Sequence, residues 1–190
     1  MVKVLDYKDY NELEVKASFS AGNRLYRLVW AITWCLLASW TPPALAGWRR
    51  WLLILFGAKV GHRSEIRGSV KVWAPVNLVM EDYVLIAQDV TCYNQARITL
   101  KRGSLVSQGA HLCCGTHDIY GSNFQLIAKE IVIGEGAWVA AEAFVGPGVT
   151  IGRRAVLGAR GVAFKDLEEN GIYVGNPAKL LKYRAPEAAK

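Results

Sequence analysis

A repeat of six residues is the feature that most limits the folds open to this chain. From Ile133 onward an apolar residue recurs at every sixth position, in the series Ile133, Val139, Val145, Ile151, Leu157 and Ala163. The residue after each of the aliphatic ones is Gly or Ala. Because six is a multiple of two, the period suits extended chain and is far from the 3.6 residues of a helical turn. One hexad cannot bury its own apolar side chain, so the hexads are predicted to stack as coils of a solenoid.

The same period extends upstream in a weaker form and is interrupted twice. It holds for Val60, Ile66, Val72, Leu78, Val84 and Val90, and again for Leu100, Val106 and Leu112. These two series are out of frame by four residues across "TCYNQARI", which indicates a local insertion. The second interruption is longer, since the pattern resumes after Leu112 only at Ile133. We expect residues 113–130 to form a loop excluded from a coil, where function is often found.

Charge and tryptophan content distinguish the N-terminal part. From Val15 to Ser64 there are seven Lys or Arg and no Asp or Glu, and this region holds five of the seven tryptophans. The uncharged apolar run from Leu28 to Trp40 has 13 residues, whereas roughly 20 are needed to span a bilayer. Because Pro42 and Pro43 follow, we predict two short helices joined by a Pro turn. These helices either cap the solenoid alone or also contact a membrane surface, and the sequence leaves both open.

The expected organisation is one domain with an N-terminal helical extension. The extension covers residues 1–57, the solenoid 58–175 with its loop at 113–130, and a tail 176–190. Four cysteines give neither a disulfide framework nor a CxxC metal motif, and the first 20 residues do not resemble a signal peptide. The predicted location is the cytoplasm, with peripheral contact at the inner face of the cytoplasmic membrane through residues 24–56 if the helices bind lipid. No nucleic-acid partner is expected.

Three stretches carry a family resemblance. The hexads "IGEGAWVAAEAFVGPGVTIGRRAVLGARGV", the loop "GTHD" and the ending "VGNPAKLLK" resemble the hexapeptide-repeat acyltransferases. Within them the chain is most similar to the colanic acid biosynthesis acetyltransferases, relatives of the maltose, galactoside and nodulation-factor O-acetyltransferases. The resemblance implies an all-β fold, a left-handed parallel β-helix with three hexads per coil. It also implies a homotrimer, acetyl-CoA as co-substrate and no metal.

The activity that the resemblance implies is transfer of an acetyl group to a sugar hydroxyl in exopolysaccharide or lipid-linked oligosaccharide synthesis. This reaction needs a base for the hydroxyl proton, and a neutral imidazole serves at pH 7. His117 occupies the catalytic position of the family in "GTHD", which predicts a general base in direct transfer without an acyl-enzyme. Asn94 aligns with an acceptor-binding position, although several relatives have Asp there. Tyr93 and Asp118 are further candidates for binding the carbohydrate acceptor.

The resemblance places acetyl-CoA along the C-terminal hexads, with an aromatic side chain on the pantetheine arm and lysines at the phosphates. The expected contacts are Trp138, the backbone of Ala140, Ala141 and Ala159, and the side chains of Lys165, Lys179 and Lys182. The sequence departs from the usual family pattern in "GARG", "AFKD" and "AAEA". These departures put Arg160, Phe164 and Glu142 close to the expected donor site.

Three other interpretations stay open on the sequence. One is acyl transfer to an amine or with a longer acyl chain, and another is a catalytically silent hexapeptide-repeat scaffold. The third is a metal enzyme with three His ligands, as in the γ-class carbonic anhydrases, which share this architecture. His111 and His117 are six residues apart and therefore on different faces of one coil, which disfavours a metal site. His62 and His111 are expected to be structural or solvated.

Overall fold

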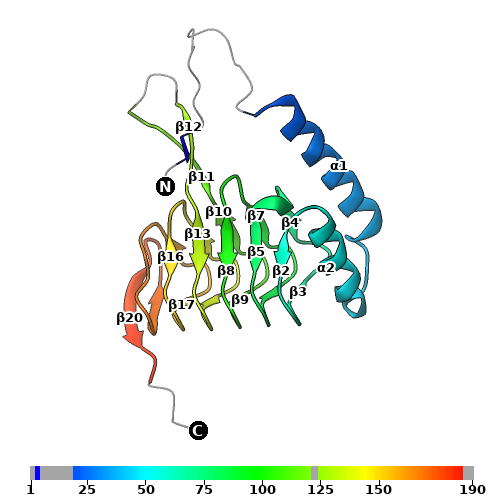
Figure 1. Ribbon diagram of the computed structural model, residues 1–190. Helices are drawn as coiled ribbons and strands as arrows, with labels where there is room; N and C mark the ends of the chain where they lie inside the picture. Colours follow the sequence, from blue (N-terminus) through cyan, green and yellow to red (C-terminus); the bar gives the residue numbers. More distant parts are fainter. Residues whose placement is uncertain (1–2, 5–18, 121–123, 186–190) are drawn as a thin grey trace.

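The computed structural model describes residues 3–4, 19–120 and 124–185. Its main body is a parallel β-helix, in which short strands of successive coils line up in three sheets (Figure 1). We call these sheets the first, second and third face, in the order in which each coil visits them. The predicted solenoid of hexads is confirmed.

Each of the first five coils contributes one strand to each face, and β19 of the last coil extends the second face. The first face is formed by β2 (Lys59–Val60), β5 (Leu78–Met80), β8 (Ile98–Leu100), β13 (Ile131–Ile133) and β16 (Thr150–Ile151). The second is formed by β3 (Glu65–Ile66), β6 (Leu85–Ile86), β9 (Leu105–Val106), β14 (Trp138–Val139), β17 (Val156–Leu157) and β19 (Gly171–Val174). The third is formed by β4 (Lys71–Val72), β7 (Thr91–Tyr93), β10 (His111–Cys113), β15 (Phe144–Val145) and β18 (Val162–Ala163). At the end of the second face, β20 (Lys179–Tyr183) pairs antiparallel with β19.

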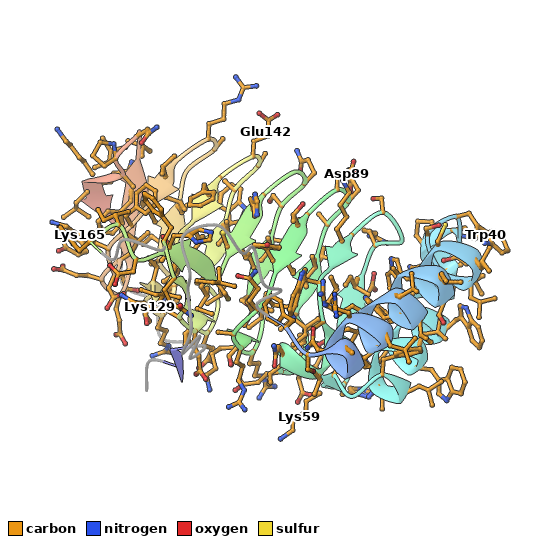
Figure 2. The ribbon with its side chains drawn as sticks, turned by 90° about the horizontal axis from the view of Figure 1, so that it is seen from above. Trp40, Lys59, Asp89, Lys129, Glu142 and Lys165 are labelled. Carbon is orange, nitrogen blue, oxygen red and sulfur yellow. The ribbon has the colours of Figure 1, made fainter. Side chains whose placement is uncertain are left out.

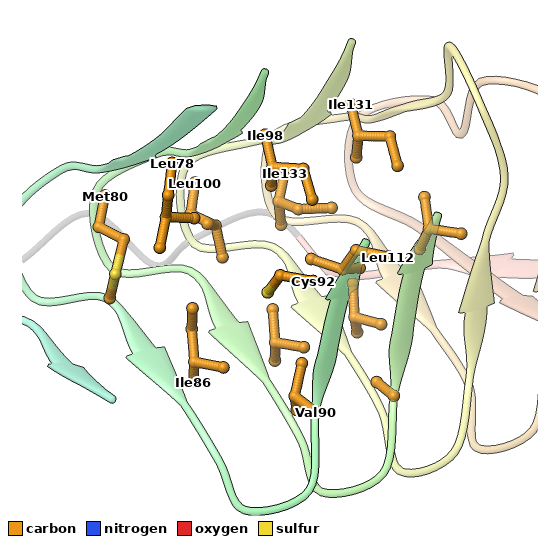
Figure 3. Close-up of a cluster of buried hydrophobic side chains, with 14 of the residues drawn as sticks. Leu78, Met80, Ile86, Val90, Cys92, Ile98, Leu100, Leu112, Ile131 and Ile133 are labelled. Atoms are coloured by element: carbon orange, nitrogen blue, oxygen red, sulfur yellow. The ribbon is translucent and has the colours of Figure 1, made fainter. Parts of the chain in front are cut away.

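The core lies inside the β-helix and is filled by aliphatic side chains that point inward from the three faces (Figure 3). The inward residues of the second face form a continuous ladder, Ile66, Ile86, Val106, Val139 and Leu157, through the strand pairing. Complete burial of such a side chain contributes roughly 1.5–3 kcal/mol. Because each residue of the ladder is covered by the coils on either side, the core is built by stacking rather than within a coil.

Two coils are longer than the repeat predicts. Val60 pairs with Met80 and Met80 with Leu100, so the first two coils have 20 residues, whereas Ile133 pairs with Ile151 after 18. In each long coil the two added residues lie at the corner between the third and first faces. The four-residue offset across "TCYNQARI" is therefore the sum of two small expansions, and the prediction of a single insertion was wrong.

The predicted frame of the second coil is shifted by two residues. Val60, Ile66 and Val72 stack on Met80, Ile86 and Cys92 rather than on Leu78, Val84 and Val90. The three predicted residues are buried all the same. In extended chain a shift of two residues keeps a side chain on the same side, so an inward pattern fixes the face but not the strand register.

Two helices cap the first coil, as predicted. These are α1 (Ala21–Leu37) and α2 (Ala46–Leu55), joined through Pro42 and a 3-10 turn, η1 (Pro43–Leu45). The Oγ of Ser20 accepts a hydrogen bond from the Asn23 amide at 3.2 Å and caps α1. In the described parts of the chain, no helix is long and apolar enough to cross a membrane.

The side chains beneath the helices attach them to the β-helix through hydrogen bonds. The indole nitrogens of Trp30 and Trp34 donate to the carbonyls of Val72 and Gly68, at 2.7 and 3.0 Å. Arg49 is completely buried. Its guanidinium is satisfied without a carboxylate, by the carbonyls of Ile66, Thr41, Pro42 and Pro43 and by the Thr41 hydroxyl. The cap is therefore part of the folded body.

A β-hairpin leaves the coil between the third and first faces, within the predicted loop. Its strands are β11 (Gly115–His117) and β12 (Leu126–Ala128), and β1 (Lys3–Val4) pairs with the other edge of β12 (Figure 1). A Cβ atom at Gly115 would overlap the end of the Gln95 side chain, so a larger residue at the first position of "GTHD" would require Gln95 to move. The loop is therefore an ordered hairpin in its described residues.

Candidate active site

His117 lies on β11, the first strand of the hairpin, and its side chain is exposed. The Nδ1 atom is 2.6 Å from the carbonyl oxygen of Phe124 across the hairpin. A carbonyl can only accept a hydrogen bond, so Nδ1 carries the proton in the neutral ring and Nε2 keeps its lone pair. The ring is thus held in the tautomer that a general base requires.

The cysteines near the hairpin are poor nucleophiles. Burial raises the pKa of the Cys92 and Cys114 thiols to about 12. Burial also raises the pKa of Cys113, whose thiol donates to the Gly115 carbonyl. Because the thiolate is the reactive species, none of these three residues is suited to carry an acyl group.

The structure does not support the predicted acceptor contact by Asn94. This side chain is completely buried, its Oδ1 accepts from the Ala74 amide at 3.0 Å, and its Nδ2 donates to the Ala74 carbonyl at 2.7 Å. The amide therefore links two neighbouring coils and presents no polar atom at the surface. The Asn in place of Asp at this position is explained by a site that needs a donor and an acceptor together.

The two other predicted acceptor residues lie at the base of the hairpin. Tyr93 is partly exposed at the end of β7 and pairs with Cys113, where the hairpin leaves the coil. Asp118 follows His117, but its Oδ1 accepts from the Tyr120 amide at 3.0 Å and shapes the hairpin. The carbonyl of Phe124, rather than Asp118, holds the imidazole.

The corner between the second and third faces presents a row of backbone amides. Four successive coils turn here through a residue with positive φ, at Asp89, Gly109, Glu142 and Arg160. The residues just before them are Gln88, Gln108, Ala141 and Ala159, and their amides donate to no backbone carbonyl among the described residues. Asp89 and Glu142 mark this edge in Figure 2. A row of outward donors suits an extended ligand with amide carbonyls.

Two of the three predicted backbone contacts to the cofactor lie in the amide row. Ala141 and Ala159 belong to the amide row. Ala140 does not, because its amide donates to the Leu157 carbonyl and its own carbonyl accepts from the Ala143 amide. The expectation of a cofactor bond from Ala140 is therefore not supported, since both its backbone groups hold the coils together.

Trp138 lies on the second face next to this corner and is 43% exposed. Its indole nitrogen donates to the Ser107 hydroxyl at 2.9 Å, which fixes the ring against the preceding coil. The ring borders a hollow of about 510 Å³ that Leu105, Val156 and Ile172 also line. An exposed, oriented aromatic beside an apolar hollow is suited to hold a flexible ligand chain.

The predicted lysines lie at two places, all of them exposed. Lys179 and Lys182 are on β20, at the end of the second face. Lys165 follows β18 and lies at the corner between the third and first faces, at the end of the molecule far from the helices (Figure 2). Only the first two extend the surface formed by Trp138 and the amide row.

The unusual Glu142 and Arg160 occupy equivalent positions in successive coils and form an ion pair. The Nε atom of Arg160 is 2.6 Å from Oε2 of Glu142. The guanidinium holds the pKa of the Glu142 carboxyl below its ordinary value. The two departures from the family pattern therefore compensate each other, and Arg160 is engaged with a carboxylate at the corner.

A single chain does not bring the imidazole and the amide row together. The hairpin leaves at the corner between the third and first faces, whereas the amide row follows the corner between the second and third.

The role of the Phe124 carbonyl was not predictable from the sequence, because every residue carries a carbonyl. Ser107 is recognisable only after the coils are aligned, when it falls one coil before Ala140. In the described ranges, no three His, Cys, Asp or Glu residues gather as metal ligands.

The fold places the protein in a defined class. The chain resembles a maltose O-acetyltransferase from Clostridium difficile 630, with a TM-score of 0.79 and 19% identity over 88% of this chain and 90% of that one. It also resembles a hexapeptide-repeat acetyltransferase from Vibrio cholerae in complex with acetyl coenzyme A, with a TM-score of 0.78 and 22% identity over 90% and 94%. The fold is thus the left-handed parallel β-helix of these enzymes.

Sequence similarity assigns the family. The chain is 40% identical over 177 residues to WcaF of Escherichia coli (strain K12), which is named as an acetyltransferase of colanic acid biosynthesis. The matched region covers 93% of this chain and 97% of WcaF. No protein-family model matches the chain. The protein belongs to the hexapeptide-repeat acetyltransferases and is an acyltransferase.

Proposed function

We propose that this protein transfers an acetyl group from acetyl-CoA to a sugar hydroxyl in exopolysaccharide or lipid-linked oligosaccharide synthesis. The observation that carries the proposal is the hydrogen bond from His117 Nδ1 to the Phe124 carbonyl, which leaves Nε2 as a base. The similarity to WcaF, named for colanic acid biosynthesis, supports a sugar acceptor.

The proposed reaction is a direct transfer. Nε2 of His117 takes the proton of the acceptor hydroxyl while the oxygen attacks the thioester carbonyl. The tetrahedral intermediate then collapses, the bond from carbon to sulfur breaks, and the imidazolium returns the proton to the thiolate of CoA. The raised thiol pKa values of Cys92, Cys113 and Cys114 support a path without an acyl-enzyme.

The donor would bind along the second face and its corner. The amides of Ala141 and Ala159 would bond the pantetheine arm, and Trp138 would pack along it. Lys179 and Lys182, beyond the end of this surface, would meet the phosphates. Neutralised by Arg160, Glu142 would not repel the phosphates or the leaving thiolate as a free carboxylate would.

A homotrimer would complete the site. Because His117 and the amide row lie at different corners of one chain, the imidazole of one subunit must approach the amide row of a neighbour. Lys165, at the same corner as the hairpin, would join the site from the imidazole side. Threefold rings of this kind are common closed assemblies.

Release of the CoA thiol, measured with a panel of donors and acceptors, tests the function. We expect acetyl-CoA with a sugar or lipid-linked oligosaccharide acceptor to be the productive pair, and mass spectrometry should show one added acetyl group on the acceptor. A preference for an amine or for a longer acyl chain would replace the O-acetyl assignment. Absence of both thiol release and a rise in melting temperature with CoA would indicate a silent scaffold.

A further inference from the structure

The two N-terminal helices are apolar on both sides, but the β-helix covers only one side. Successive residues of a helix are 100° apart, so Leu28 and Ile32 of α1 lie opposite the buried Trp30 and Trp34. We call the uncovered surface the outward face. It consists of Leu25, Leu28, Val29, Ile32, Leu36, Trp40, Trp48, Trp51, Ile54 and Leu55, which are between 39% and 71% exposed. Nine large apolar side chains on the two helices, together with Trp40 between them, exceed what a solvated surface needs.

The last carbonyls of α1 accept hydrogen bonds from the protein and need none from water. The last carbonyls of a helix have no partner inside it and normally bond to solvent. Here the carbonyl of Cys35 accepts from the Ser39 hydroxyl at 2.8 Å, and those of Leu36 and Leu37 accept from the indoles of Trp40 and Trp48 at 2.8 and 2.7 Å. An exposed helix end whose carbonyls are all bonded by the protein suits surroundings without water.

Charge indicates the chemistry of those surroundings. Helices α1 and α2 contain no Asp or Glu. Cations on the helices and in the adjoining coil include Arg24 at the start of α1, Arg50 on α2, and Lys59 and Arg63 in the first coil. Arg50 is half-buried, and its guanidinium donates to the Val60 and Gly61 carbonyls. The nearby carboxylate of Glu65 is paired with Arg67 at 3.5 Å. The charged residues beside the outward face are therefore complementary to an anionic surface.

We propose that the outward face docks on the surface of an anionic lipid bilayer. Tryptophan is the residue that best suits this boundary, because its ring enters the apolar layer while its N–H remains bonded. Trp48 and Trp51 are stacked with ring centroids 5.1 Å apart, and Trp40 lies at the extreme end of the molecule (Figure 2). The helices lie at the end of the β-helix opposite β20, so docking leaves the hairpin and the amide row free (Figure 1).

Co-sedimentation of the full chain with lipid vesicles tests the proposal. We expect binding to vesicles rich in phosphatidylglycerol and much weaker binding to vesicles of phosphatidylcholine alone. Ile32→Glu and Trp51→Glu should each lower the affinity for the anionic vesicles by about tenfold or more. Both side chains are exposed, so circular dichroism and thermal unfolding should match the wild type. The matched control is Leu181→Glu, on an exposed apolar residue of β20, and it should bind as the wild type does.

Three results would overturn the proposal. The first is no sedimentation of the wild type with anionic vesicles, and the second is undiminished binding of both helix variants. The third is a smaller assembly for Ile32→Glu than for the wild type in analytical ultracentrifugation, which would show that a second copy of the chain covers the outward face. Equal binding to neutral and to anionic vesicles would show that the cations do not contribute to docking.

Discussion

His117 depends on a backbone atom for its tautomer. The Phe124 carbonyl fixes the Nδ1–H tautomer, a task that a carboxylate performs in many enzymes. Phe124 itself has a positive φ of 47°, which is unusual for a residue with a large side chain. The proposal of His117 as the base rests on the family resemblance of "GTHD", and the interrupted repeat indicated only that this residue lies outside the coils. The group that orients the base was not predictable, since no side chain marks it.

Thiol reactivity tests the burial of the cysteine side chains. With an aromatic disulfide reagent at pH 8, we expect the exposed Cys35 to react at once. Cys92 and Cys114 should react only on unfolding, since burial raises the pKa of each thiol to about 12. Peptide mapping of the labelled protein identifies the site. Rapid labelling of Cys92 or Cys114 in the native protein would contradict the buried positions.

His111 provides a pH dependence of stability. Burial lowers its pKa below the ordinary value of 6.5, so the unfolded chain binds the proton more readily than the folded one. The stabilising contribution is complete above pH 6.5 and is lost as the pH falls through the pKa of the folded state. Urea unfolding between pH 7.5 and 5 should therefore show a smaller loss for His111→Gln than for the wild type. Equal losses in both proteins would contradict this account.

At the scale of elements, the repeat predicted more of the fold than of its register. A period of six specifies which side chains point inward, and the inward residues from Ile133 to Leu157 are all buried. It could not fix the strand positions of the second coil, because Leu78 and Met80 both point inward two residues apart. The helices were predictable from the apolar run and its Pro stop. The contact of Arg49 was not, because its acceptors are carbonyls scattered over two segments.

The hairpin should be removable without loss of the β-helix. Leu112 and Ile133 are 21 residues apart, and the equivalent Cys92 and Leu100 only 8, so deletion of the 13 residues 115–127 restores the spacing of the second coil. Strands β10 and β13 keep all their partners on the neighbouring coils. We expect a folded protein without transferase activity.

Far-ultraviolet circular dichroism and cooperative thermal unfolding check the deletion variant. A variant with the same length removed from residues 131–143 is the control, and it should not fold, because β13 and β14 belong to the core. A deletion of 115–127 that abolishes folding would show that the hairpin is part of the structure rather than an addition to it.

At the scale of the whole molecule, the active site is predicted to lie between chains. Co-expression of a His117→Ala chain with a Trp138→Asp chain should restore part of the activity that each lacks alone, because mixed assemblies contain sites with both native residues. Sedimentation velocity should give a mass three times the 21.0 kDa of one chain. Monomeric active protein, or no restoration in confirmed mixed assemblies, would show that each chain carries a complete site.

The central claim is that His117 takes the proton of the acceptor, and turnover of His117→Ala with acetyl-CoA binding measured on the same sample tests it most directly. The side chain is exposed, so the variant should fold and bind acetyl-CoA with nearly unchanged affinity. Turnover should fall by roughly a hundredfold to ten-thousandfold, the contribution of a general base. A folded His117→Ala protein with wild-type turnover would contradict the account.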